Sequence, residues 1–322
     1  MRYMKQVRSL ILAAALSVMM TVASSPQASA RERLKIGVTL HPYYSFAVNI
    51  VGDLATVLPL IKPGFNSHAY TPQPDDIKRV RDFDVLIVNG IGHDEFAFEI
   101  LEAARLKGKL PLIYANEGVS LIPIAGTDTG EKMVNPHTFI SITASIQQIY
   151  NISKALKKLD PDNADAYSKN TRDYVKRLRQ MKAMYMEKLA ALPDMDFRCA
   201  TIHGGYDYLL QEFGLKVTTV IEPGHGLKPT ASQLAKTIDK IRDLDVDVVF
   251  TEMNFPDKYV DSIQRETGVR IRYLSHLTSG DYTASGFEEG LRANIEALTS
   301  ALIESHDRRG QNRGNQNEHT GS

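Results

Sequence analysis

The 322-residue sequence lacks several features that mark particular classes of protein. It has one cysteine, Cys199, so no disulfide can form within the chain. Basic and acidic residues balance at 38 each, which argues against a nucleic-acid partner, since that needs an excess of Lys and Arg on one face. There is no nucleotide-cradling glycine loop and no HExxH zinc-protease helix. We expect Cys199, in the apolar stretch FRCATI, to be a buried and inert packing residue.

The first thirty residues are typical of an export signal. A basic start without acidic residues is followed by the apolar stretch 10–23 and by a small-residue cleavage site, Ala28-Ser29-Ala30. The apolar stretch is too short to cross a bilayer of about 30 Å, although a membrane anchor is the alternative. No cysteine lies near the cleavage site, which disfavours a lipid anchor. We therefore expect a signal peptide over 1–30 and a periplasmic mature chain beginning near Arg31.

The mature sequence has an α/β pattern that occurs twice. Short, apolar, β-branched runs alternate with helical patterns, which predicts largely parallel sheets with βαβ crossovers. In the first half the strands are expected at 34–40, 55–61, 84–88 and 110–114, with a helix over 94–106. In the second half they are expected at 197–202, 217–221, 246–251 and 269–274, with helices over 206–213, 231–244, 258–267 and 285–305. We predict an N-terminal lobe over 31–160 and a C-terminal lobe over 193–305.

A long helix is expected between the two lobes, over 161–192. After its opening turn this segment has no proline or glycine, acidic residues stand near its start, and basic residues follow, as the helix dipole favours. Such a rod would join the lobes rigidly; two shorter helices with a break near Tyr185 are the alternative. The tail over 306–322 has no aliphatic residue, and we expect it to be disordered.

Four positions could supply metal ligands from loops that follow strands or precede helices: His68, His137, His203 and Asp281. In an open α/β sheet, ligand groups gather beyond the carboxyl ends of the strands, so one crevice between the lobes could bring these four together. Three imidazoles and one carboxylate suit tetrahedral zinc. Spacing alone, however, does not single out these four residues.

Ordered motifs across about 220 residues of the chain resemble those of the metal-specific solute-binding proteins of ABC importers, the ZnuA/TroA-like family. The matching segments are His68-Ala69-Tyr70 through Pro72, Asn135-Pro136-His137, His203 with Tyr208, the block 229–234 with 248–252, and Asp281-Tyr282. The resemblance implies two (β/α) lobes joined by one long helix, and a metal site between the lobes made of His68, His137, His203 and Asp281.

The resemblance also implies what the chain does. It predicts a protein that is not an enzyme but captures Zn(II) in the periplasm and passes it to the membrane permease of an ABC importer. A periplasmic metal-donating protein is a possible further partner, and a monomer is expected. Histidine at the third ligand, His203, goes with zinc in this family, whereas glutamate there goes with manganese or iron. The chain has no histidine-rich insertion over 118–135, and in this it resembles the short-loop, AztC-like subgroup of the family.

The other histidines receive plainer interpretations. We expect His93 to lie on a surface loop, with an approach to the crevice as the alternative. We expect His41 and His276 to pack after their strands, with orientation of a ligand as the alternative. His225 lies in a glycine-containing loop that could gate the site. Three other functions stay open. One is a manganese or iron carrier of the same fold, and another is a secreted zinc hydrolase, for which Glu252 is the one candidate base. The third is an adhesin with incidental metal, which the missing lipoprotein cysteine disfavours.

Overall fold

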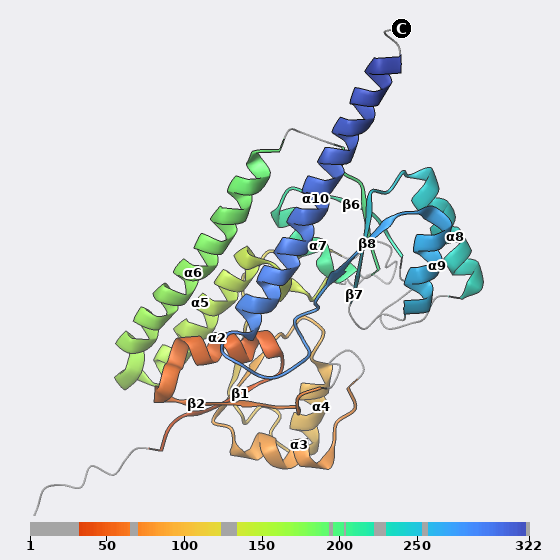
Figure 1. Ribbon diagram of the computed structural model, residues 1–322. Coiled ribbons are helices and arrows are strands. Elements are labelled where there is room, and N and C mark those ends of the chain that lie inside the picture. The colour runs from red at the N-terminus through yellow and green to blue at the C-terminus, as the bar shows by residue number, and fades with distance from the viewer. Residues whose placement is uncertain are drawn as a thin grey trace, which may run out of the picture. The chain divides into compact units, whose positions relative to one another are not determined.

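Two four-stranded sheets form the framework of the computed structural model, which describes residues 32–64, 70–123, 134–192, 196–202, 204–221, 230–252 and 257–319 (Figure 1). The fold described here is that of the unit that begins at Leu34. The expected signal peptide over 1–30, the proposed ligands His68 and His203, and the candidate gate His225 lie outside the described residues.

The first sheet contains β1 (Lys35–Val38), β2 (Thr56–Pro59), β3 (Val85–Val88) and β4 (Leu112–Tyr114), in the order β2-β1-β3-β4. All its strand pairs are parallel. Every residue of β3 is buried, as expected for a strand covered on both faces, and this is why its sequence, VLIV, is apolar without alternation. The four strands confirm those expected from the sequence.

The second sheet repeats this topology with β5 (Cys199–Thr201), β6 (Val217–Val220), β7 (Val248–Glu252) and β8 (Arg270–Leu274), in the order β6-β5-β7-β8. Its pairs are also parallel, and its strands confirm the expected ones. In the first sheet β1 and β3 are the central neighbours, and the chain continues from β1 to β2 on one side and from β3 to β4 on the other. The second sheet has the same arrangement, with β5 and β7 at its centre. Ligand crevices of open α/β sheets form at such switch points, outside the carboxyl ends of the strands.

Helices connect the strands in both lobes. The first lobe has α2 (His41–Val51), η1 (Gly52–Leu54), α3 (Pro74–Arg79), η3 (Val80–Asp82), α4 (Glu95–Ala103), η4 (Thr138–Ile140) and α5 (Ile142–Leu159). The second has η6 (Gly204–Tyr206), α7 (Asp207–Glu212), α8 (Ala231–Asp243) and α9 (Asp257–Thr267). Local signals set several of these ends: Ser141 caps α5 through the amide of Ala144, and Thr230 and Gln233 form a capping box at α8.

The long helix between the lobes is present as η5 (Pro161–Asn163) followed by α6 (Ala164–Ala190). It runs unbroken through Tyr185, so the alternative of two shorter helices is wrong. Its 27 residues span about 40 Å. One face is buried and packs against α2 and α5 of the first lobe and against α10 (Gly286–His319), which follows β8 (Figure 1).

One hydrophobic core is shared by the two lobes. It contains Ile36 and Ile87 of the first sheet, Phe250 of the second sheet, and Leu178 of α6, all fully buried. Separate, smaller clusters lie on the far side of each sheet. Opening the lobes as rigid halves would expose part of the shared core to water, and exposing apolar area is costly at about 25 cal/mol per Å².

The C-terminal segment differs from the sequence-based expectation. A disordered tail was expected from His306, but α10 continues through His319. No proline interrupts residues 286–319, so nothing in the sequence forces the helix to stop at the end of its apolar pattern. Among the described residues, none of the helices combines the length and the apolar character that a membrane span requires. Cys199 is buried as expected, and burial raises the pKa of its thiol to about 12.

Candidate metal centre

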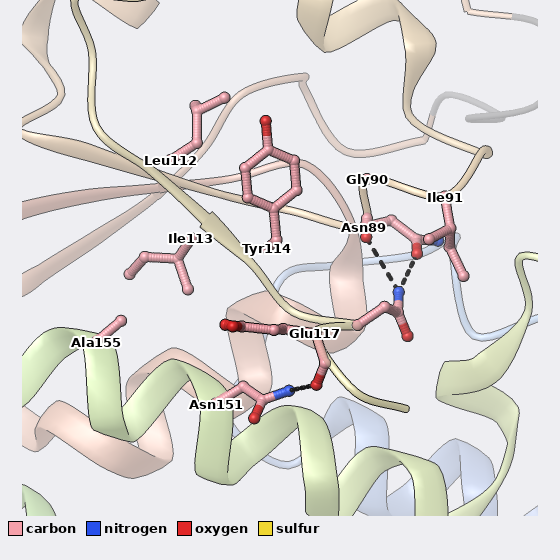
Figure 2. Close-up of a pocket in the computed structure, with 10 residues that line it drawn as sticks. Asn89, Gly90, Ile91, Leu112, Ile113, Tyr114, Glu117, Asn151 and Ala155 are labelled. Carbon is pink, nitrogen blue, oxygen red and sulfur yellow. Dashed lines mark hydrogen bonds between the residues drawn. The ribbon is translucent and has the colours of Figure 1, made fainter. Parts of the chain in front are cut away.

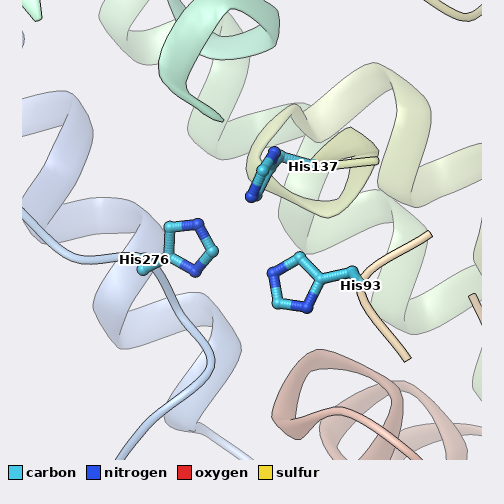
Figure 3. A group of neighbouring side chains, drawn as sticks. All are labelled: His93, His137 and His276. Carbon is cyan, nitrogen blue, oxygen red and sulfur yellow. The ribbon is translucent and has the colours of Figure 1, made fainter. Parts of the chain in front are cut away.

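Three histidines from distant parts of the chain meet near the carboxyl ends of the strands (Figure 3). His93 follows β3, His137 directly precedes η4, and His276 follows β8. The ring centroids lie 4.9 Å apart for His93 and His137, 5.2 Å for His93 and His276, and 4.6 Å for His137 and His276. Each offers a ligand nitrogen within 4.8 Å of the other two, and no other group of three His, Cys, Asp or Glu residues in the described parts of the chain is this close.

His93 is held by the tight loop 89–94 after β3. Gly90 and Gly92 adopt φ angles of 75° and 108°, which glycine reaches without cost. His93 itself has φ 82°, an uncommon value for a residue with a side chain, and such backbone strain concentrates at functional sites. The loop therefore turns the His93 ring inward at a conformational cost.

The carboxylate of Asp94 closes this loop. It accepts hydrogen bonds from the backbone amide of Asn89 (2.6 Å), the hydroxyl of Thr39 (2.8 Å) and the backbone amide of Gly90 (3.2 Å). Burial raises the pKa of Asp94 to about 6, and the three hydrogen bonds oppose that shift. Because Asp94, at the end of the turn, binds the backbone amides at its start, it closes the turn and fixes the position of the neighbouring His93.

The expectation of a surface loop for His93 is wrong. Its side chain is only 6 % exposed. The sequence signal that could have identified it is the pattern Gly-x-Gly-His-Asp directly after a buried strand. His276 does pack as expected, against Phe139 and Tyr206, but it also lies beside the other two imidazoles.

His137 is 1 % exposed and is oriented by Asn135. The side-chain amide of Asn135 donates to the carbonyl of Gly204 (2.8 Å), which turns its oxygen toward His137. This oxygen then accepts from His137 Nδ1 (2.7 Å) and from the His137 backbone amide (3.1 Å). Since an amide oxygen can only accept, Nδ1 carries the proton and Nε2 carries the lone pair that a metal requires.

A buried amide network ties the loop of His93 to the segment of His137. Asn89 donates to the carbonyl of Pro136 (3.0 Å), and Asn116 donates to the carbonyl of Asn89 (3.1 Å) and to its side-chain oxygen. The oxygen of Asn116 accepts from Thr138 (2.7 Å) and Gln148 (2.8 Å). Both segments are thus fixed to one set of polar contacts, which favours a preformed arrangement of the two rings.

A cavity of about 430 Å³ lies on another side of this network (Figure 2). It is lined by Asn89, Gly90, Ile91, Leu112, Ile113, Tyr114, Asn116, Glu117, Asn151 and Ala155. Its lining contains no histidine and a single carboxylate, Glu117. This cavity therefore lacks the donor set that a transition metal needs, and the histidine group is the stronger candidate.

Of the four ligands predicted from the sequence, the structure describes two, His137 and Asp281. His137 is central to the histidine group, whereas His68 and His203 lie outside the described residues. Tyr70, two positions after His68, is fixed by a 2.6 Å hydrogen bond to Asp76. Asp281 is exposed in the segment between β8 and α10 and is not part of the group of three.

The segment around Asp281 is attached to α2 of the other lobe. His41 Nε2 donates to the carbonyl of Gly280 (2.9 Å), and its ring stacks on Tyr282 at 3.9 Å. Burial lowers the pKa of His41, so this ring is neutral at pH 7. The hydroxyl of Ser45 donates to the carbonyl of Thr283 (2.7 Å). His41 therefore packs, as expected, and holds the backbone beside Asp281.

Comparison with known proteins agrees with this architecture. The chain is 29 % identical to the iron-binding protein YfeA of Yersinia pestis over 259 residues, which cover 80 % of this chain and 82 % of YfeA. It is 26 % identical to the high-affinity zinc uptake system protein ZnuA of Bacillus subtilis over 285 residues, 84 % of this chain and 88 % of that protein.

A solved structure is more similar. FpvC of Pseudomonas aeruginosa in complex with Mn²⁺ is 52 % identical, with a TM-score of 0.81 over 85 % of this chain and 100 % of that chain. The same protein is known in complex with Ni²⁺, with a TM-score of 0.79. The family described as "Zinc-uptake complex component A periplasmic" matches residues 36–301. This chain therefore belongs to the ZnuA family of metal-binding substrate-binding proteins of ABC transporters.

Proposed function

We propose that this protein captures Zn(II) in the periplasm and delivers it to the permease of a cognate ABC importer, without catalysing a reaction. The observation that carries the proposal is the convergence of imidazoles on His137, whose Nε2 is set up as a ligand by Asn135. Nitrogen donors of borderline softness suit zinc, whereas manganese prefers oxygen donors. The cleavable signal peptide, the periplasmic location and the monomeric state belong to the same proposal.

The proposed ligands are His68, His137, His203 and Asp281. Two contacts support this set. Gly204, the residue after His203, accepts a hydrogen bond from Asn135, the same residue that orients His137. Asp281 belongs to the segment that His41 attaches to the first lobe, and its charge is felt by the His41 ring. Four protein ligands close a tetrahedron and leave no position for the water that a hydrolase would activate.

Metal competition tests the assignment of zinc. The relatives are named for iron and zinc, and FpvC is known with Mn²⁺ and with Ni²⁺, so the fold alone does not select the metal. We expect metal-free protein to bind one Zn²⁺ in isothermal titration calorimetry, and Mn²⁺ at least about a hundredfold more weakly, because of the nitrogen-rich donor set. Equal or tighter binding of Mn²⁺ or Fe²⁺ in the same titration would make this protein a carrier of that metal instead.

Substitution of Asn135 tests whether its side chain fixes the orientation and tautomer of the His137 ring. We expect Asn135→Leu to weaken zinc binding by roughly 10- to 100-fold, the usual cost of losing a group that orients a ligand histidine. Asn135→Asp should recover most of the affinity, because a carboxylate still accepts the Nδ1 proton of His137 although it cannot donate to Gly204. Equal losses in both variants would show that the contact with Gly204, and not the His137 tautomer, is what Asn135 provides.

A further inference from the structure

We propose that His93 and His276 are metal ligands in their own right and share His137 with the ligand set above, so that this protein holds a second, all-imidazole set. The inference rests on the proposed function and extends it. It concerns two residues that the family resemblance did not select and that the structure brings to His137 from opposite lobes.

The geometry of the three rings fits a single ion. Because the three ligand nitrogens lie within 4.8 Å of one another, some point between them is within about 2.8 Å of all three. Zinc binds imidazole nitrogen at about 2.0–2.1 Å, so each nitrogen needs to move inward by less than about 1 Å. Small changes of side-chain torsion supply such a movement, while the backbone segments stay where the loop contacts hold them.

Each of the three histidines is held in place by neighbouring groups. Asp94 and the two glycines hold the loop of His93, and Asn135 holds His137. His276 Nδ1 lies 3.0 Å from the hydroxyl of Thr278, a buried residue two positions later. Partners of this kind fix the ring orientation of metal-binding histidines; His137 and His276 have one on the ring itself, and His93 is positioned through its loop.

One aromatic side chain lies against all three imidazoles. Phe139 lies beside all three rings, with centroid distances of 5.3, 6.0 and 6.1 Å to His93, His137 and His276. Phe139 thus packs against the whole group and helps to hold the three rings near one another.

The donor type defines the class of ion. Three nitrogens without an oxygen favour the later divalent ions of the first transition row, such as Ni²⁺, Co²⁺ and Zn²⁺, over Mn²⁺ and Ca²⁺. The four-ligand set includes the carboxylate of Asp281 and therefore discriminates less strongly against Mn²⁺ and Ca²⁺. The all-imidazole set would thus bias the whole site toward the later metals.

The test separates the two ligand sets by substitution. One variant combines His68→Ala, His203→Ala and Asp281→Ala, which leaves the all-imidazole set intact. A second variant adds His93→Asn and His276→Gln to the first; asparagine is chosen because it tolerates the positive φ at position 93. His306→Ala, on the surface of α10, is the matched control for loss of a histidine. Each is titrated with Ni²⁺, Zn²⁺ and Mn²⁺, with the ligand-field absorption of Co²⁺ reporting nitrogen coordination, and thermal melting reports folding.

The triple variant is expected to bind one Zn²⁺ or Ni²⁺ with measurable affinity and Mn²⁺ at least about a hundredfold more weakly, and the fivefold variant to bind none. In the otherwise unchanged chain, His276→Gln alone should weaken Ni²⁺ binding by at least tenfold. If the unchanged protein binds zinc but the triple variant melts normally and binds nothing, the second set does not exist and the proposed function stands. If the unchanged protein binds no metal, both the proposed function and the second ligand set are wrong.

Discussion

His137→Ala should abolish high-affinity metal binding, with a loss of at least about a hundredfold in affinity. Losing only a residue that orients a ligand costs roughly 10- to 100-fold, and losing the ligand itself costs more. His137 is expected to have the largest effect of any single histidine because it belongs to both proposed ligand sets. No other described imidazole can replace it from its position between the two lobes.

The measurement is calorimetric titration of metal-free His137→Ala with Zn²⁺, beside His306→Ala as the control. His306 lies on α10 beside Asp307, away from the histidine group, so its loss should leave the affinity unchanged. Thermal melting shows whether the site variant still folds. Zinc binding within threefold of the unchanged protein would contradict both ligand sets at once.

The sequence predicted the framework well because its signals are local. The strands of both parallel sheets are short, continuous apolar runs, and α6 follows from a segment that has no internal proline or glycine and carries charges matching the helix dipole. These features depend on neighbours along the chain. Each was therefore visible before any contact between distant residues was known.

The candidate site was predicted only in part, since it depends on contacts between distant segments. His93, His137 and His276 are separated by 44 and 139 positions, and only folding shows that their rings meet. His93 was misplaced because a loop with two glycines ordinarily lies at the surface. Here the buried carboxylate of Asp94 turns that loop inward, an effect that the sequence pattern did not reveal.

The shared core bears on how metal is released. Leu178 of α6 and residues of both sheets belong to one buried cluster, and α6 packs on helices of both lobes. A wide opening of the lobes would expose this cluster, whereas movement of loops and exchange of ligands would not. We therefore expect the two lobes to behave as one cooperative unit in which changes on metal binding stay near the carboxyl ends of the strands.

Leu178→Ala tests this cooperativity, and it should lower the free energy of unfolding by about 2–5 kcal/mol, the range for a leucine lost from a well-packed core. Because the core is common to both lobes, thermal unfolding should stay a single transition, shifted down by roughly 5–15 °C. Zinc affinity at 25 °C should change by less than threefold, since Leu178 has no part in the histidine group.

Gln180→Ala, at an exposed position on the same helix, serves as the control and should change the unfolding free energy by no more than about 0.5 kcal/mol. Differential scanning calorimetry of the metal-free proteins distinguishes the possibilities. Two separate transitions in Leu178→Ala, with only one of them shifted, would mean that the lobes unfold independently. In that case a hinge between the lobes, rather than movement of loops and ligands, would become the route by which metal leaves the site.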